Sequence, residues 1–206
     1  MSSNGEDKAR DRLLRTASEL FYRNGILSTG VDALIEGAGI AKATFYRHFP
    51  SKDDLVVAWL RQPEARWLDW VVAELERRGG SPLQRLVGFW DVLGEWLEER
   101  NFIGCPFINT LVEIRDHRSP ARREVESFIQ EVEDYLTESA AAAGLPDPAE
   151  QGRRMRYIAM AVFVGSPLER SRRPTETARA QAIDLIAISL RTTAATIERR
   201  IAEGDA

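Results

Sequence analysis

The chain has 206 residues, of which 44% are apolar and 29% are charged, and these values are typical of globular rather than disordered proteins. No apolar run approaches the roughly 20 residues needed to cross a bilayer, and the polar start of the chain has no apolar segment of the kind found in signal peptides. We therefore expect a cytoplasmic protein without a membrane segment. Its one cysteine, Cys105, excludes an intrachain disulfide and a cysteine-based zinc site.

Charge is unevenly distributed along the chain. The net charge of −4 and the pI near 5.4 do not by themselves indicate a nucleic-acid binder, whose domains are usually basic. However, residues 1–52 contain eight Lys or Arg against six acids, a net +2, and they include all three lysines of the chain. The acids of this segment all precede residue 37, so the stretch 37–52 carries only positive charge.

The N-terminal segment predicts three helices before residue 50. Apolar residues at helical spacing predict an amphipathic helix over 7–24 and a second, shorter one over 31–38. Gly39 follows the second helix, where a tight turn favours a residue without a side chain. A third short helix is predicted over 41–48.

The rest of the chain is also predicted to be helical. Ser51 is the expected N-cap of a fourth helix, which could extend to Arg78 with a kink or break near Pro63. Cap, glycine and proline signals predict further helices over 83–100, after Pro106, and over 120–143, 149–164 and 176–202, with a loop over 166–174. No stretch alternates long enough to predict a strand, so the fold class is all-α, with about nine helices.

The third helix has two chemically different faces. At 100° per residue, Ala41, Phe45 and Phe49 are predicted to form the buried face. The opposite face carries a small residue, an arginine and hydroxyls: Ala43, Thr44, Tyr46 and Arg47. Arginine can pair with O6 and N7 of guanine, a small residue permits close approach to the bases, and hydroxyls bind phosphates. With the preceding helix and the Gly39 turn, this face predicts a helix-turn-helix that enters the major groove.

The string TGVDALIEGAGIAKATFYRHFPSKDDLV, residues 29–56, resembles the DNA-binding signature of the TetR family of bacterial regulators. The resemblance covers roughly residues 8–56. Gly37 is a mild departure from it, because glycine weakens the end of a helix by up to about 1 kcal/mol relative to alanine. The resemblance implies a DNA-binding domain over 1–52 and an effector-binding and dimerisation domain over 53–206.

The resemblance also implies which residues contact DNA. Lys42, Ala43 and Arg47 should face bases, and a second set should hold phosphates: Thr29, Thr44, Tyr46, His48 and Lys52. The two-faced helix supports Ala43, Thr44, Tyr46 and Arg47 independently, whereas Lys42 and His48 lie at the flanks of its buried face. For Thr29 and His48 a purely structural role at a helix end stays open, and a tyrosine such as Tyr46, taken alone, is more often a packing residue than a DNA contact.

The larger segment is rich in bulky aromatic residues, which fill a core or line a pocket between helices. The family resemblance implies a cavity for a small lipophilic effector, near Trp67, Phe89, Trp90, Cys105, Phe107, Asn109 and Phe163. Asn109 and Glu113 share a helix face at i, i+4, so both are candidates for polar contacts to a ligand. Satisfaction of these polar groups within the protein is the alternative.

Dimerisation is implied by the same resemblance, through the last two predicted helices. The stripe Ala182, Leu185, Ile186, Ser189, Leu190, Thr193 and Ile197 suits a four-helix bundle with a twofold mate, and it also suits an internal helix. Two recognition helices roughly 34 Å apart would read a near-palindromic operator. Effector binding would favour a spacing that no longer matches DNA, with Pro63 as a candidate pivot.

Other classes of function are weakly supported. GAGIAK resembles part of a dinucleotide fingerprint, but it lies between predicted helices rather than after a strand. Only His48 and His117 are available, without metal-ligand spacing or a nucleophile motif, so no enzyme, metal or cofactor is expected. The open alternatives are a regulator gated by a protein partner, an architectural DNA binder without a ligand, and an activator.

Overall fold

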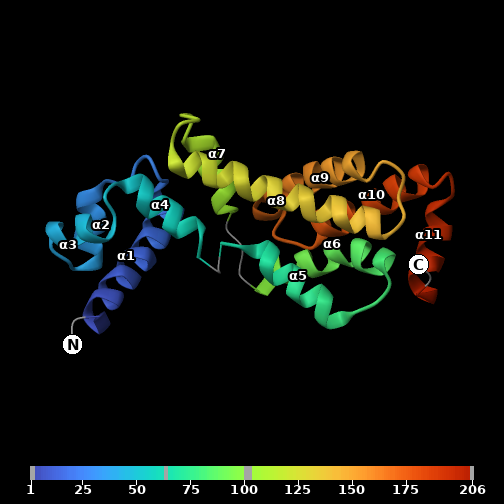
Figure 1. The fold of residues 1–206 in the computed structure, drawn as a ribbon, viewed down its shortest axis with the longest axis horizontal. Helices are drawn as coiled ribbons and strands as arrows, with labels where there is room; N and C mark the ends of the chain where they lie inside the picture. Colours follow the sequence, from blue (N-terminus) through green and yellow to red (C-terminus); the bar gives the residue numbers. More distant parts are fainter. Residues whose placement is uncertain (1–2, 63–64, 100–103, 205–206) are drawn as a thin grey trace. The chain divides into compact units, whose positions relative to one another are not determined.

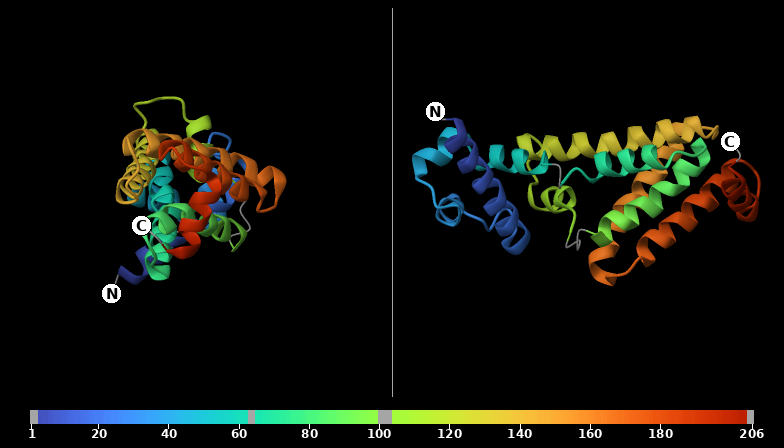
Figure 2. Two further views of the ribbon diagram at one scale, coloured as in Figure 1. Left: turned by 90° about the vertical axis from the view of Figure 1, so that its right-hand side faces the viewer. Right: turned by 90° about the horizontal axis from the view of Figure 1, so that it is seen from below.

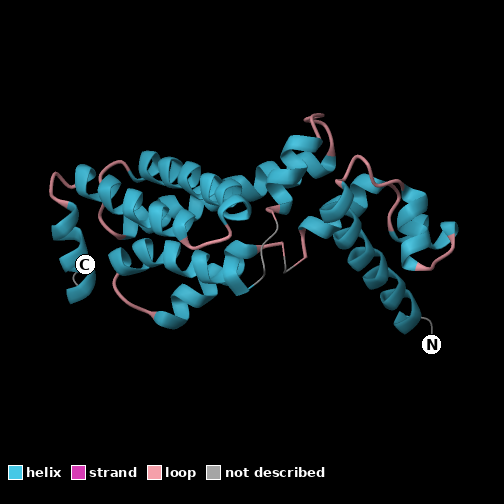
Figure 3. Cartoon of the chain, turned by 180° about the vertical axis from the view of Figure 1, so that it is seen from behind, coloured by secondary structure: helices cyan, strands magenta, loops and turns pink. Residues whose placement is uncertain are grey.

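The computed structural model describes residues 3–62, 65–99 and 104–204. Within these ranges the chain forms eleven helices (Figure 1) and no strand (Figure 3), which confirms the predicted all-α class. In chain order they are α1 (Ser3–Asn24), α2 (Val31–Ala38), α3 (Lys42–His48), α4 (Lys52–Leu60), α5 (Trp67–Arg78), α6 (Pro82–Glu99), α7 (Pro106–Glu113), α8 (Pro120–Ala142), α9 (Pro148–Glu169), α10 (Arg173–Ser189) and α11 (Ala194–Glu203).

Two predicted helices are each divided in the structure. The fourth forms α4 and α5, so the expected break is confirmed, although Pro63 itself lies outside the described residues. The last predicted helix forms α10 and α11, because Arg191 adopts a left-handed conformation with φ of 52°. Thr193 then caps α11, and its hydroxyl accepts a hydrogen bond from the Thr196 amide at 3.2 Å. The single helix predicted over 176–202 was therefore wrong.

The loop predicted over 166–174 is shorter than expected. Helix α9 continues through Pro167 to Glu169, and α10 begins at Arg173. Pro167 lies in the last turn of α9, where it removes one backbone hydrogen bond of the helix. Because α9 is longer than predicted, its outer face carries apolar residues as far as Leu168.

Packing divides the chain into two compact units, each described by itself. The N-terminal unit contains the described residues of Met1–Arg66 and Cys105–Ser127, and the C-terminal unit contains those of Trp67–Gly104 and Phe128–Ala206. The N-terminal unit therefore includes α7 and the first turns of α8 besides α1–α4. The predicted functional boundary at residue 52 stays a prediction, since the units follow packing alone.

The helix-turn-helix is held by close packing of α2 on α1. Gly37 lies at this contact, because a Cβ there would be 2.7 Å from the Cγ2 atom of Thr16. Gly39 ends α2 in the left-handed conformation, with φ of 60° and ψ of 46°, which glycine adopts at no steric cost. The glycine that departs from the family pattern therefore permits a close helix contact. In the right-hand view of Figure 2, α1–α4 (blue to cyan) gather into one group.

The C-terminal unit is built around an aromatic cluster. Trp67 of α5 contacts three rings, with centroid distances of 6.1 Å to Phe89, 5.8 Å to Phe128 and 4.8 Å to Phe163. Trp90 packs edge-on against Phe89 at 5.0 Å. All five side chains are buried, so rings from α5, α6, α8 and α9 share one core. Among the described helices, none combines the length and the apolar character that a membrane span requires.

Candidate nucleic-acid interface

Helix α3 buries one face and exposes the other. Phe45 is fully buried and Phe49 is 4% exposed, which agrees with the sequence analysis. Ala41 does not belong to the buried face as predicted, because it is the extended N-cap of α3 and is exposed. The outward face holds Lys42, Ala43, Tyr46 and Arg47, all exposed, with Thr44 half-buried. A large side chain such as Tyr46, 45% exposed, is available to a partner.

Aromatic contacts fix the rotation of α3 about its axis. The ring of Phe45 lies 5.2 Å from that of Tyr46 and 6.3 Å from that of Phe49, measured between centroids. The guanidinium of Arg10 in α1 sits 5.7 Å from the centroid of Phe49, a cation–π arrangement. Since Phe45 and Phe49 cannot turn outward without losing this packing, the faces of α3 are fixed before any DNA binds.

Lys42 begins α3 close to the first turn of α2. Its Nζ atom lies 3.8 Å from a carboxylate oxygen of Asp32, and both side chains are largely exposed. Exposed pairs of this kind add little to stability and are screened by salt. The ammonium of Lys42 can therefore exchange Asp32 for a DNA acceptor at little cost.

Two of the predicted phosphate contacts use their polar atoms within the protein. Thr29 is buried, and its hydroxyl lies 2.7 Å from the Gly25 carbonyl oxygen, to which it donates. The ammonium of Lys52 donates to the carbonyl oxygens of Ile26, at 2.9 Å, and of Thr29, at 3.1 Å. The Lys52 side chain thus ties the α1–α2 loop to α4, whereas the Thr29 hydroxyl bonds within the loop. Their contact with phosphates stays a prediction.

Like Thr29 and Lys52, His48 does not lie on the exposed face of α3. It is half-buried at the end of α3, and its Nε2 atom is buried with no hydrogen-bond partner in the described part of the chain. Its ring centroid lies 6.4 Å from that of Phe49. The structure therefore places His48 beside the buried face, and its phosphate contact also stays a prediction.

Side chains of α7 and of the start of α8 hold the α1–α2 loop and α4, respectively. The carboxylate of Glu113, the last residue of α7, accepts a hydrogen bond from the Leu27 amide at 2.8 Å. Ser119 donates to Asp53 of α4 at 2.7 Å, and Arg61 pairs with Glu124 of α8 at 2.7 Å. These contacts join residues 63 to 86 positions apart, so nothing in the local sequence pattern indicates them.

Two family models match this chain. The model of the bacterial regulatory proteins of the TetR family matches residues 13–59, and that of the tetracyclin-repressor-like C-terminal domain matches residues 82–182. The chain belongs to the TetR family. Its N-terminal match contains α2, the Gly39 turn and α3, so the helix-turn-helix described above is that of a TetR-family regulator.

Relatives and solved structures agree with this assignment. The transcriptional repressor NemR of Escherichia coli is 22% identical over 195 residues, which cover 91% of this chain and 98% of NemR. The repressor KstR2 of Mycolicibacterium smegmatis is 33% identical over 95 residues, 45% of this chain and 44% of its own. The structure of a TetR-family regulator from Streptomyces coelicolor superposes with a TM-score of 0.76 at 28% identity, covering 89% of this chain and 96% of that one.

The eight residues predicted near the effector do not all lie in one unit. Trp67, Phe89, Trp90 and Phe163 belong to the aromatic cluster of the C-terminal unit. Cys105, Phe107, Asn109 and Glu113 belong to the N-terminal unit, with the TetR-family helix-turn-helix. That all eight residues lie near one effector site stays a prediction.

The residues of the N-terminal group differ in their surroundings. Asn109 is exposed, whereas the carboxylate of Glu113 binds the α1–α2 loop. Cys105 is buried, and burial raises the pKa of its thiol to about 11. The thiol therefore stays protonated at neutral pH, and because the thiolate is the nucleophile, Cys105 is a poorly reactive cysteine in this TetR-family protein.

We expect Glu113→Ala to weaken operator binding about threefold to tenfold and to lower stability by about 1 kcal/mol, the value of a typical hydrogen bond. The loop it releases leads into α2, which positions α3. Removing a negative charge near DNA would by itself strengthen binding. Weaker binding by Glu113→Ala would therefore come from a displaced α3 and not from the change in charge. Fluorescence anisotropy with operator DNA and thermal denaturation measure the two quantities.

Glu203→Ala is the matched control, because it removes an exposed carboxylate from the end of α11 and changes the net charge equally. It should leave both quantities unchanged. Equal or tighter operator binding by Glu113→Ala would contradict a positioning role for Glu113.

Proposed function

We propose that this TetR-family protein is a homodimeric transcriptional repressor that acts in the cytoplasm. It binds a near-palindromic operator through α3 and leaves the DNA when a small lipophilic molecule binds the C-terminal region. The observation that carries the proposal is the outward face of α3, where a small residue, a tyrosine and two cations stand exposed above two buried phenylalanines. The similarity to the repressor NemR, which extends over 91% of this chain, supports repression rather than activation.

The outward face offers complementary contacts to the major groove. Arg47 and Lys42 can donate to guanine, Ala43 permits close approach and can contact a thymine methyl, and the hydroxyls of Thr44 and Tyr46 can bind phosphates. The acidic balance of the whole protein disfavours unspecific coating of DNA. Sequence recognition therefore depends on this short helix rather than on a basic surface.

Arg47→Ala should weaken binding to an operator selected from random DNA by about 1 to 3 kcal/mol, and it should relax specificity at one base pair in each half-site. Removal of a bidentate base contact affects the specific complex more than a complex with random DNA. Fluorescence anisotropy on the selected operator and on scrambled duplex at one fixed salt concentration gives both affinities. Equal losses on the two duplexes would instead make Arg47 a phosphate contact.

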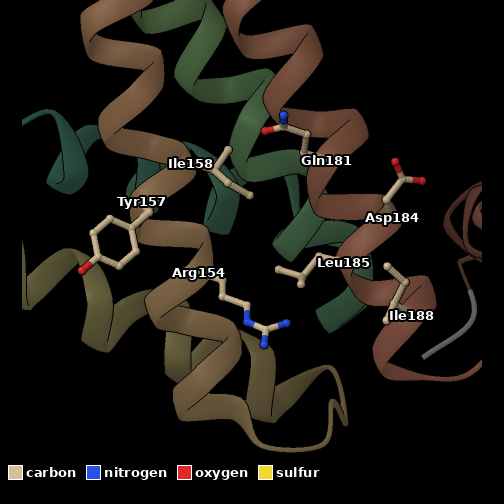
Figure 4. Close-up of a pocket in the computed structure, with 7 residues that line it drawn as sticks. All are labelled: Arg154, Tyr157, Ile158, Gln181, Asp184, Leu185 and Ile188. Carbon is tan, nitrogen blue, oxygen red and sulfur yellow. The ribbon is translucent and has the colours of Figure 1, made fainter.

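The proposed dimer surface is the outer face of α9 and α10. Four large apolar side chains are exposed there: Tyr157, Val164 and Leu168 on α9, and Ile188 on α10. Between the two helices lies a hollow of about 370 Å³ (Figure 4), lined by Arg154, Tyr157, Ile158, Gln181, Asp184, Leu185 and Ile188. Exposed apolar side chains in one patch mark an interaction site, and a twofold operator requires a second copy of the chain.

The heptad-like stripe predicted from the sequence is only partly on this surface. Ala182 and Ile186 are fully buried within the protomer, and Ile197 is buried beneath α11. Thr193 is a helix cap. We therefore base the proposed interface on the residues of α10 that line the hollow, which are Gln181, Asp184 and Ile188, all exposed, and the half-buried Leu185.

Ile188→Arg should convert the dimer into a monomer at micromolar concentration. Ile188 is 73% exposed, so the change spares the protomer core while placing two like charges near the twofold axis. Size-exclusion chromatography with light scattering measures the mass, and operator affinity should fall at least about tenfold because the two half-sites no longer bind together.

Val112→Arg is the matched control. Val112 of α7 is also an exposed apolar residue, 66% accessible, but it lies outside the α9–α10 surface. This variant should remain dimeric. A dimeric Ile188→Arg protein with unchanged operator affinity would exclude the α9–α10 surface as the interface.

The aromatic cluster supplies the proposed effector contacts. The indole Nε1 atoms of Trp67 and Trp90 are buried and have no hydrogen-bond partner in the described part of the chain. A buried donor without a partner costs about 1 to 3 kcal/mol. A lipophilic ligand with a carbonyl or ether oxygen would accept a hydrogen bond from one of these indole N–H groups. Its apolar surface would pack against the rings of the cluster.

We therefore expect neutral aromatic ketones and quinones to raise the thermal midpoint of the protein by about 2–4 °C per kcal/mol of binding. The same compounds should release operator DNA. Trp90→Phe keeps the apolar contact and removes the donor, so it should reduce the thermal shift without destabilising the free protein. If no compound in the panel shifts the midpoint, gating by a protein partner becomes the better explanation.

A further inference from the structure

A second hollow lies within the N-terminal unit, between α1 and the end of α4. It measures about 240 Å³ and is lined by Arg15, Ser18, Tyr22, Trp59, Gln62 and Ala65. The first three residues follow one another at i, i+3 and i+7, so they share a face of α1. Sites for drug-sized ligands span roughly 300–1,000 Å³, so this hollow suits a molecule of one or two rings.

The floor of this hollow is a fixed aromatic surface. Trp59 is 3% exposed and packs edge-on against Phe21 at 5.2 Å and against Tyr22 at 5.6 Å, measured between ring centroids. Burial, and to a smaller extent Cys105, raises the pKa of the Tyr22 phenol. The phenol is therefore neutral at physiological pH, and it can donate a hydrogen bond as well as accept one.

Four polar side chains surround the floor, those of Arg15, Ser18, Tyr22 and Gln62. In the described part of the chain, no carboxylate lies within ion-pair distance of Arg15, and the side chains of Ser18, Tyr22 and Gln62 make no hydrogen bond. By contrast, Arg61 and Arg122 in the same unit each pair with a glutamate, at 2.7 Å and 2.8 Å. The hollow thus combines the guanidinium of Arg15, three neutral polar groups and an aromatic floor.

We propose that the hollow between α1 and α4 binds an aromatic monocarboxylate. The guanidinium of Arg15 suits a planar carboxylate, to which it can donate two parallel hydrogen bonds. The ring of the ligand would lie against Trp59, since aromatic pairs prefer offset or edge-on contact. Ser18, Tyr22 and Gln62 would set its orientation.

This site is separate from the proposed effector contacts, because the aromatic cluster belongs to the C-terminal unit. Its walls are the helices that carry the helix-turn-helix, since α1 packs on α2, α3 and α4. A ligand bound there changes operator affinity by whatever factor DNA changes the affinity of the ligand. The protein would then respond to two chemically different molecules, one neutral and one anionic.

The test titrates the full-length protein with indole-3-carboxylate, with neutral indole-3-carboxamide and with acetate, by isothermal titration calorimetry. We expect a Kd of about 1 mM or tighter for the carboxylate, and binding at least about tenfold weaker for the other two probes, which lack the charge or the ring. Arg15→Gln should weaken carboxylate binding about tenfold or more, and Ser18→Leu, which fills the hollow, should abolish it.

Arg12→Gln is the charge-matched control, since it removes an exposed cation of the same helix that does not line the hollow. It should bind the carboxylate like the parent protein. Circular dichroism and thermal denaturation establish that each variant is folded. Undetectable binding by the parent protein, or equal binding by the parent and Arg15→Gln, overturns the proposal, and equal binding by Ser18→Leu places the ligand elsewhere.

Discussion

The burial of Phe45 and Phe49 is the constraint on which the DNA-binding face depends. Helix α3 has only seven residues, too few to be stable alone, so its existence and its rotation come from tertiary packing. Two aromatic side chains at i and i+4 fix that rotation, because turning α3 would expose both rings to water at a cost of roughly 1.5–3 kcal/mol each. With the rings inward, Ala43 and Arg47 must face outward.

The frame around α3 shows why several polar residues of the signature point inward. The ammonium of Lys52 and the hydroxyl of Thr29 donate to carbonyl oxygens of the α1–α2 loop, so the polar atoms of this loop are satisfied within the protein. Glu113 satisfies an amide of the same loop from the other side. The loop is thus held by three side chains from different parts of the chain, and the spacing between α1 and α2 follows from it.

The N-terminal unit is larger than the matched DNA-binding region. It includes α7 and the first turns of α8, which are attached by the Glu113, Ser119 and Glu124 contacts. Helix α8 is continuous from Pro120 to Ala142, and its residues belong to both units. Within the N-terminal unit, α7 is therefore joined to the α1–α2 loop by a hydrogen bond, and the start of α8 is joined to α4 by a hydrogen bond and an ion pair.

The sequence by itself determined the all-α class, the helix-turn-helix and the faces of α3, because these follow from apolar periodicity and local turn signals such as Gly39. It also indicated the aromatic character of the C-terminal core. Only the tertiary structure decided that Glu113 binds the α1–α2 loop, that Ala182 and Ile186 are internal, and that α10 ends before Arg191. These features depend on contacts between residues far apart in the chain or on one left-handed residue, and helical periodicity carries no information about either.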